Sequence, residues 1–143
     1  MGELDQIRQR KTTQAAPTAL RVPAEVDQLP VVRAVARTLA ILDDFTLDEV
    51  ADITLAVDQA CAELIAAAPA GAELRCSFLH IESGLLISIG GCLGCGGVPN
   101  QHSFGWHVLA TLTDSLSISH RPCDAQDTGQ DMTIEFVKHR GAG

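Results

Sequence analysis

The chain has 143 residues and a net charge of −8, from 10 basic and 18 acidic residues. A chain of this length is expected to form one domain, which buries roughly two-thirds of its unfolded surface. Nucleic acids and anionic membranes bind clustered Lys and Arg, so the acidic balance argues against both as partners. It suits a basic protein partner, or it serves solubility. Aliphatic side chains supply most of the 46% hydrophobic share, which predicts an aliphatic core.

The N-terminal segment and the cysteines indicate the compartment. Residues 1–12 are polar and lack the apolar stretch of a signal peptide. No apolar run approaches the length of about 20 residues that a membrane-spanning helix needs. The five cysteines are an odd number, and a disulfide framework is not expected. These features predict a cytoplasmic protein.

Residues 1–17 are charged and polar without periodicity, and we expect a disordered tail followed by one domain over residues 18–140. Within this domain, Thr46-Leu-Asp-Glu49 is typical of a capping box that begins a helix. Hydrophobic periodicity and turn residues predict, in chain order, a strand at 19–22, a helix from 25 to about 43, a helix at 46–68, strands at 74–78 and 85–89, a Gly-rich loop at 90–103, a helix at 104–112, and strands at 116–120 and 132–138. This order predicts an α+β two-layer sandwich, with the helices on one face of a mostly antiparallel mixed sheet.

Four motifs carry a resemblance to a known family. The run LAVDQACAELI at 55–65 resembles the AV-x-E-A-x-x-N-x-I helix of GHKL ATPases and kinases. Residues 102–116 resemble the glycine box and helix that follow in that family, and SFGWHVL at 103–109 resembles its actinobacterial sigma-F branch. Residues 129–136 resemble the closing strand. In this order the motifs cover residues 19–138, and the chain resembles the RsbW/SpoIIAB type of anti-sigma factor, a serine kinase with the GHKL (Bergerat-type) fold.

The resemblance implies a specific function. Members of this family bind a sigma factor, keep it from core RNA polymerase, and release it when an anti-anti-sigma protein of the STAS fold competes. In active members, ATP with Mg²⁺ phosphorylates a serine of that competitor. The resemblance also implies a homodimer, and the first-helix arginine that contacts both partners matches Arg33.

The catalytic pair of the resemblance is replaced in this chain. Gln59 stands where the family has its Glu, and an amide cannot accept the proton of the attacking hydroxyl. Asp58 is no substitute, because one step along a helix turns a side chain by about 100°. Glu63 stands where the family has its Mg²⁺-binding Asn. A carboxylate can bind Mg²⁺ but repels the phosphates.

The nucleotide loops depart as well. The loop with Gly94 and Gly96 lacks the Asp that binds the adenine amino group in the family, although its amides could still cradle phosphate. In the second glycine box, Ser103 replaces the first Gly and Gly105 is retained. Thr133 is the candidate for the adenine-side Thr, since Gln130 stands at the matching position. We therefore expect ATP and Mg²⁺ to bind weakly or not at all.

Two alternatives stay open. One is an active ATP-dependent serine kinase of the same fold that phosphorylates its STAS antagonist. The other is a redox or metal sensor that uses the C-x-x-C pair Cys92 and Cys95. Cys61 and Cys76 fall on apolar faces and are interpreted as small core residues.

Overall fold

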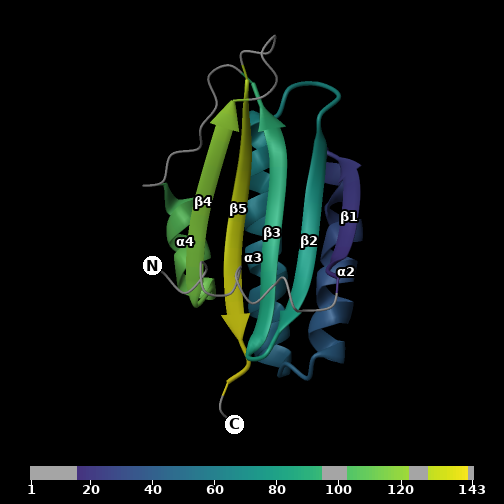
Figure 1. Cartoon of the computed structure of the whole chain (residues 1–143), viewed down its shortest axis with the longest axis vertical. Helices are drawn as coiled ribbons and strands as arrows, with labels where there is room; N and C mark the ends of the chain where they lie inside the picture. Colours follow the sequence, from purple (N-terminus) through teal and green to yellow (C-terminus); the bar gives the residue numbers. More distant parts are fainter. Residues whose placement is uncertain (1–15, 95–102, 123–128, 142–143) are drawn as a thin grey trace.

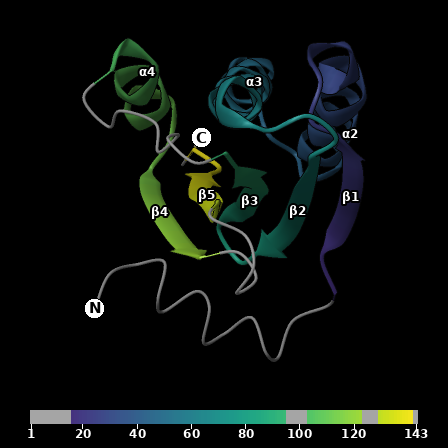
Figure 2. The ribbon, with the colours of Figure 1, turned by 90° about the horizontal axis from the view of Figure 1, so that it is seen from above.

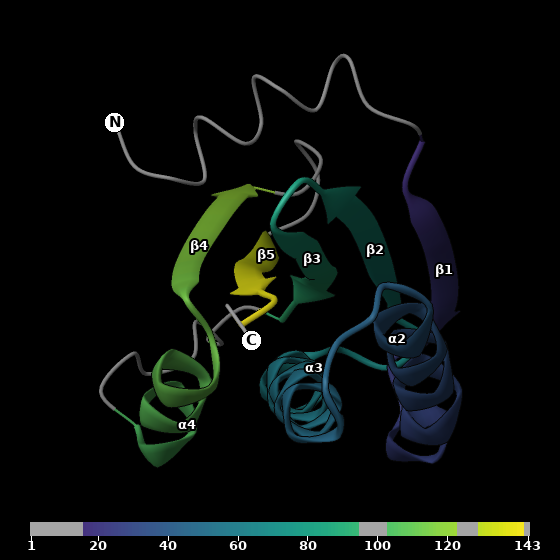
Figure 3. The same cartoon turned by 90° about the horizontal axis from the view of Figure 1, so that it is seen from below.

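A computed structural model describes residues 16–94, 103–122 and 129–141. The elements in chain order are β1 (Thr18–Pro23), the 3₁₀ turn η1 (Val26–Gln28), α2 (Leu29–Leu42), α3 (Leu47–Ala67), β2 (Glu73–Ile81), β3 (Gly84–Leu93), α4 (Phe104–Leu112), β4 (Ser115–Pro122) and β5 (Gln130–His139). The strands form one sheet in the order β1-β2-β3-β5-β4. The three α-helices lie side by side on one face of this sheet, and β1 and β4 form its edges (Figures 1 and 2). The view from below shows the same two layers (Figure 3).

The predicted α+β sandwich is confirmed, and its sheet is more regular than expected. All four neighbouring strand pairs are antiparallel, so the sheet is not mixed. The first predicted helix begins as a 3₁₀ turn and becomes α-helical only at Leu29. Pro30 lies in the first turn of α2, where its missing N–H costs no helical hydrogen bond. The predicted tail lies outside the described residues up to residue 15.

Strand β3 is longer than the sequence predicts. Residues 90–93 were assigned to a loop, yet Gly90 and Gly91 pair with Thr133 and Met132 of β5. A Cβ at Gly90 would lie 2.9 Å from the guanidinium of Arg75, which crosses over it. Glycine inside a strand often marks such a close approach. The correction is that the Gly-rich segment begins within the sheet.

The core lies between the helices and the inner face of the sheet. The apolar residues at helical spacing in α3 are buried: Val50, Ile53, Val57, Ala60, Cys61 and Leu64. From α2, the buried residues are small or branched: Val32, Ala36 and Ala40. Phe78 and Phe136 are the largest side chains that are fully buried, and the rest of the core is mainly aliphatic, as predicted.

The helix layer carries most of the negative charge. Between residues 25 and 68 the sequence has nine acidic residues and two basic ones, a net −7 out of −8 for the whole chain. Among the described residues, no helix is long and apolar enough to cross a bilayer.

The predicted capping box is present at the start of α3. The Thr46 hydroxyl accepts a hydrogen bond from the Glu49 amide at 3.2 Å, and the Glu49 carboxylate accepts one from the Thr46 amide at 2.8 Å. The same carboxylate accepts a third from the Gly141 amide at 2.5 Å. These donors, the Thr46 amide first, lower the pKa of Glu49 below its usual value.

Glu49→Gln is therefore expected to lower stability in a pH-dependent way. A carboxyl whose pKa is lower in the folded than in the unfolded state stabilises the fold above the unfolded value, and this stabilisation is lost as the pH falls through the folded value. The midpoint of thermal unfolding should thus be lower in the variant above about pH 5. The two midpoints should converge as the pH falls through the lowered folded-state pKa of Glu49. A difference that stayed constant across this range would show that the Glu49 charge does not contribute.

Candidate functional site

Gln59 and Glu63 lie together on α3. The side-chain Nε2 of Gln59 donates a hydrogen bond to Oε1 of Glu63 at 3.0 Å, and both side chains are half-buried. Their spacing of four residues puts them on one helix face, as the sequence predicts. The amide of Gln59 therefore holds the Glu63 carboxylate in place.

The first turn of α4 closes over this pair. A Cβ at Gly105 would collide with the Glu63 carboxylate and with the Gln59 amide. Both groups are the ends of flexible side chains, so a larger residue at position 105 would require the Gln59 and Glu63 side chains to shift. Ser103, two residues earlier, is the N-cap of the same helix. Two of the residues predicted for the nucleotide site, Glu63 and Gly105, thus meet at Gln59 between α3 and α4, and Ser103 precedes this contact at the start of α4.

Three polar atoms at the starts of α4 and β5 lack hydrogen-bond partners among the described residues. They are Oγ of Ser103, Nε1 of Trp106 and Oε1 of Gln130, and all three are buried. Buried polar atoms are normally paired. Each of these atoms therefore has hydrogen-bonding capacity that no described residue uses.

Gly94 lies at the C-terminal end of α3, beyond Gln59 and Glu63. It follows β3, and its amide donates to the carbonyl of Ala67 at 3.0 Å. Gly96 lies outside the described residues.

The structure corrects the predicted position of Thr133. The buried residues Met132 and Ile134 flank it and point into the core, so Thr133 points to the sheet face that the helices leave open. Gln130 lies two residues before Met132 and therefore shares the helix-facing side. The structure assigns the helix-facing position to Gln130 and removes Thr133 from the candidate nucleotide site.

The described groups at the contact between α3 and α4 are the Gln59 amide and the Glu63 carboxylate. Within residues 16–94, 103–122 and 129–141, no three His, Cys, Asp or Glu side chains gather to hold a metal ion. The amide of Gln59 cannot accept a proton, and the Glu63 carboxylate already accepts the Gln59 hydrogen bond.

Arg33 joins α2 to α3. Its Nε lies 3.1 Å from both carboxylate oxygens of Asp58, and its Nη2 lies 3.0 Å from Oδ2. The Arg33 side chain remains 43% exposed, and that of Asp58 remains 27% exposed. Asp58 is thus turned towards α2 and away from its neighbour Gln59, as the sequence predicts. A ligand can reach the guanidinium, but the group already has a carboxylate partner.

The cysteines fall into two groups. Cys61 and Cys76 are buried and free, as predicted. Contact with Cys76 and burial raise the pKa of the Cys61 thiol, which keeps it protonated. Cys92 is half-buried within β3, and its C-x-x-C partner Cys95 lies outside the described residues. The sensor hypothesis is therefore untested.

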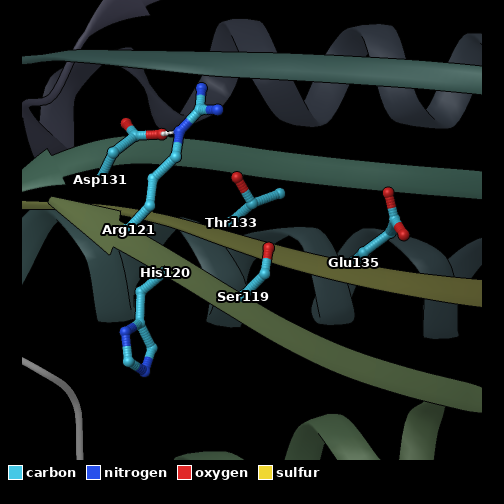
Figure 4. A pocket seen from close by; sticks show the side chains of 6 residues that line it. All are labelled: Ser119, His120, Arg121, Asp131, Thr133 and Glu135. Atoms are coloured by element: carbon cyan, nitrogen blue, oxygen red, sulfur yellow. Dashed lines mark ion pairs between the residues drawn. The ribbon is translucent and has the colours of Figure 1, made fainter. Parts of the chain in front are cut away.

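The open face of the sheet carries a polar pocket that the sequence analysis missed. A cavity of about 350 Å³ is lined by residues of β4 and β5: Ser119, His120, Arg121, Asp131, Thr133 and Glu135 (Figure 4). Asp131 lies 2.5 Å from Nη2 of Arg75 and 3.9 Å from Nε of Arg121. Polar residues at every second position of β5 were the signal in the sequence that could have predicted this face.

Comparison with known proteins adds to this geometry. No protein-family model matches the chain. The anti-sigma-F factors RsbW of two Mycobacterium tuberculosis strains, CDC 1551/Oshkosh and ATCC 25618/H37Rv, are each 28% identical to it over 123 residues, which cover 86% of this chain and 73% of the relative. The chain is similar to RsbW anti-sigma factors. The resemblance that the motifs carry is thereby confirmed.

A comparison with solved structures also finds the mycobacterial sensor histidine kinase MprB. It has a TM-score of 0.48 and 12% sequence identity, over 85% of this chain and 100% of that one. The similarity to RsbW rests on the curated relatives and on the four sequence motifs.

Proposed function

We propose that the chain is an anti-sigma factor that sequesters an alternative sigma factor in the cytoplasm and is countered by a STAS-type anti-anti-sigma protein. The observation that carries this proposal is the similarity to two proteins named anti-sigma-F factor RsbW, over 86% of the chain. The two-layer α+β fold and the acidic helix layer are compatible with a protein-binding role.

Arg33 is the proposed contact for both partners. It matches the family's partner-binding arginine, and its side chain is 43% exposed on the helix layer. A carboxylate of the sigma factor or of the antagonist would replace or share Asp58 as its partner. Charge-assisted pairs of this kind contribute about 1.5–3 kcal/mol.

Sigma capture is proposed to be independent of ATP. Gln59 replaces the proton acceptor, and its hydrogen bond to Glu63 engages the one carboxylate that stands at the family's metal-ligand position. The alternative, an active serine kinase, predicts fast phosphorylation of the STAS antagonist. The sensor alternative predicts that oxidation or zinc at Cys92 changes sigma binding.

Arg33→Ala is expected to weaken sigma capture about tenfold or more, in line with the loss of one charge-assisted pair. The sigma factors encoded next to this chain's gene would be purified and titrated by calorimetry, with and without Mg-ATP. Arg37→Ala is the matched control. Arg37 lies one helical turn away on α2, is exposed, and makes no ion pair with any described residue.

The outcomes separate the hypotheses. Failure to bind any sigma factor would refute the anti-sigma proposal. Equal affinities of the wild type and a folded Arg33→Ala variant would remove Arg33 from the interface and leave the proposal standing. If mass spectrometry detected stoichiometric phosphoserine on the STAS antagonist within minutes of adding Mg-ATP, the kinase alternative would be favoured.

A further inference from the structure

The turn between α2 and α3 exposes three large apolar side chains. Ile41, Leu42 and Leu47 are 51%, 71% and 83% exposed, and Leu47 is the most exposed large hydrophobic residue among those described. With Asp44 and Asp48, they form what we call the tip surface. It lies at the end of the helix hairpin opposite the β1–η1 connection (Figure 1). Scattered exposed hydrophobic residues are common, but a gathered patch usually marks an interaction site.

The backbone beneath the tip surface is held firmly. The Asp44 amide donates to the Ile41 carbonyl at 3.1 Å, and the Phe45 amide donates to the Ala40 carbonyl at 3.2 Å. These two bonds form a Schellman motif, with Asp44 in the left-handed conformation at φ 62°. Phe45 is buried, and the capping box follows immediately. The turn thus anchors itself through Phe45 and leaves its aliphatic side chains outside.

The C-terminal end of the domain braces the same turn from the inside. Arg140 Nη1 lies 2.6 Å from Asp43 Oδ2, and the Gly141 amide donates to Glu49. A surface presented on a fixed backbone loses less conformational entropy on binding than a mobile loop does. The exposed leucines are therefore preorganised for contact.

The charges around the tip divide into paired and unpaired groups. Asp43 pairs with Arg140, and Asp52 lies 3.3 Å from Nζ of Lys138. Asp44 and Asp48 are exposed and make no ion pair with any residue that the structure describes. The last turn of α2 has no basic residue. The tip surface is thus apolar and anionic.

We propose that the tip surface docks a basic amphipathic helix of a partner protein. The aliphatic side chains would pack on the apolar face of that helix, and Asp44 and Asp48 would pair with its Lys or Arg residues. This surface is separate from Arg33. Leu42 lies nine positions after Arg33 on α2, which corresponds to about 14 Å along the helix. Arg33 would bind acidic groups of a partner, whereas the tip surface would bind basic ones. The inference is independent of the proposed function, since it requires no sigma factor.

Labelled synthetic helices test the proposal directly. One peptide of about 18 residues, long enough to form a helix, would carry Leu at helical spacing and Lys elsewhere, and a second would carry Glu in place of Lys. Fluorescence anisotropy would measure their binding to the full chain. The Leu/Lys peptide is expected to bind, and the Leu/Glu peptide is expected to bind at least about tenfold more weakly.

Paired variants locate the binding site. Leu42→Ser with Leu47→Ser, and separately Asp44→Asn with Asp48→Asn, are each expected to weaken binding of the Leu/Lys peptide about tenfold. The matched controls are Leu55→Ser, which removes another exposed leucine, and Glu25→Gln with Asp27→Asn, which removes the same charge near η1. The controls should change binding less than about twofold. All substituted side chains are at the surface, and circular dichroism would verify folding.

Three results would overturn the proposal. The two charge variants are the tip pair (Asp44→Asn with Asp48→Asn) and the control pair near η1. If both weakened peptide binding equally, the negative charge of the chain would attract the peptide without a specific surface. Unchanged binding in the Leu42→Ser, Leu47→Ser variant would exclude the tip. Self-association of the wild type in sedimentation experiments, abolished by the same two serines and without peptide binding, would make the tip a contact between copies of this chain.

Discussion

Gly84→Ala is expected to lower the free energy of unfolding by about 3 kcal/mol or more, or to prevent folding. Gly84 begins β3 and pairs with His139 of β5. A Cβ there would overlap the Lys138 carbonyl oxygen and lie 3.0 Å from the His139 Cα. Both are backbone atoms of an interior strand, so neither can turn aside as a flexible side chain would. Denaturant titration of both proteins measures the difference.

Gly71→Ala is the control for this substitution. Gly71 has φ of +80° and no neighbouring atom within 4 Å of an added Cβ, so alanine there meets only backbone strain. That cost is about 1 kcal/mol. If Gly84→Ala cost no more than Gly71→Ala, the close approach of β3 and β5 would not constrain position 84.

Gln59→Glu is expected to destabilise the protein by about 1–2 kcal/mol at neutral pH. The substitution replaces a donor with a second carboxylate at the site of a 3.0 Å hydrogen bond to Glu63. Two carboxylates at this distance repel each other, and the pKa of one of them rises. The destabilisation should therefore diminish as the pH falls and one carboxyl becomes protonated.

Adding Glu63→Asn to the Gln59→Glu variant is expected to restore stability. The asparagine would donate a hydrogen bond to the carboxylate introduced at position 59. The double variant would then carry Glu and Asn at the positions where the family that the chain resembles has them. A double-mutant cycle from urea titrations measures the coupling, and we expect about 1–2 kcal/mol. A coupling near zero would mean that Gln59 and Glu63 do not interact in solution.

Features that depend on nearby residues could be predicted from the sequence. The capping box at Thr46 and the apolar stripe of α3 follow from spacings of three and four residues, and both are present. The same holds for Gln59 and Glu63 on one helix face. By contrast, residues 90–93 of the predicted loop belong to β3 and pair with β5, and Arg75 crosses Gly90 to reach Asp131. That contact joins residues 56 positions apart, which local propensity cannot detect.

The candidate site was predictable in its types of residue but not in its contacts. Nothing local indicates that Gly105 closes on α3, or that Arg33 is held by Asp58 on another helix. The position of Thr133 was predictable in principle, because a strand side chain changes face with every residue. Its neighbours Met132 and Ile134 are apolar, and alternation alone assigns Thr133 to the opposite face.

The segregation of charge between the two layers has a consequence for how partners arrive. Residues 25–68 hold −7 of the net charge, which leaves −1 for all the others, so the molecule is an electric dipole whose negative end is the helix layer. A cationic protein that diffuses near it is turned towards the helices before any side chain touches. At an ionic strength of about 0.1 M, salt screens this field beyond about 10 Å. The association rate with such a partner should therefore fall as ionic strength rises, while short-range contacts continue to set the dissociation rate.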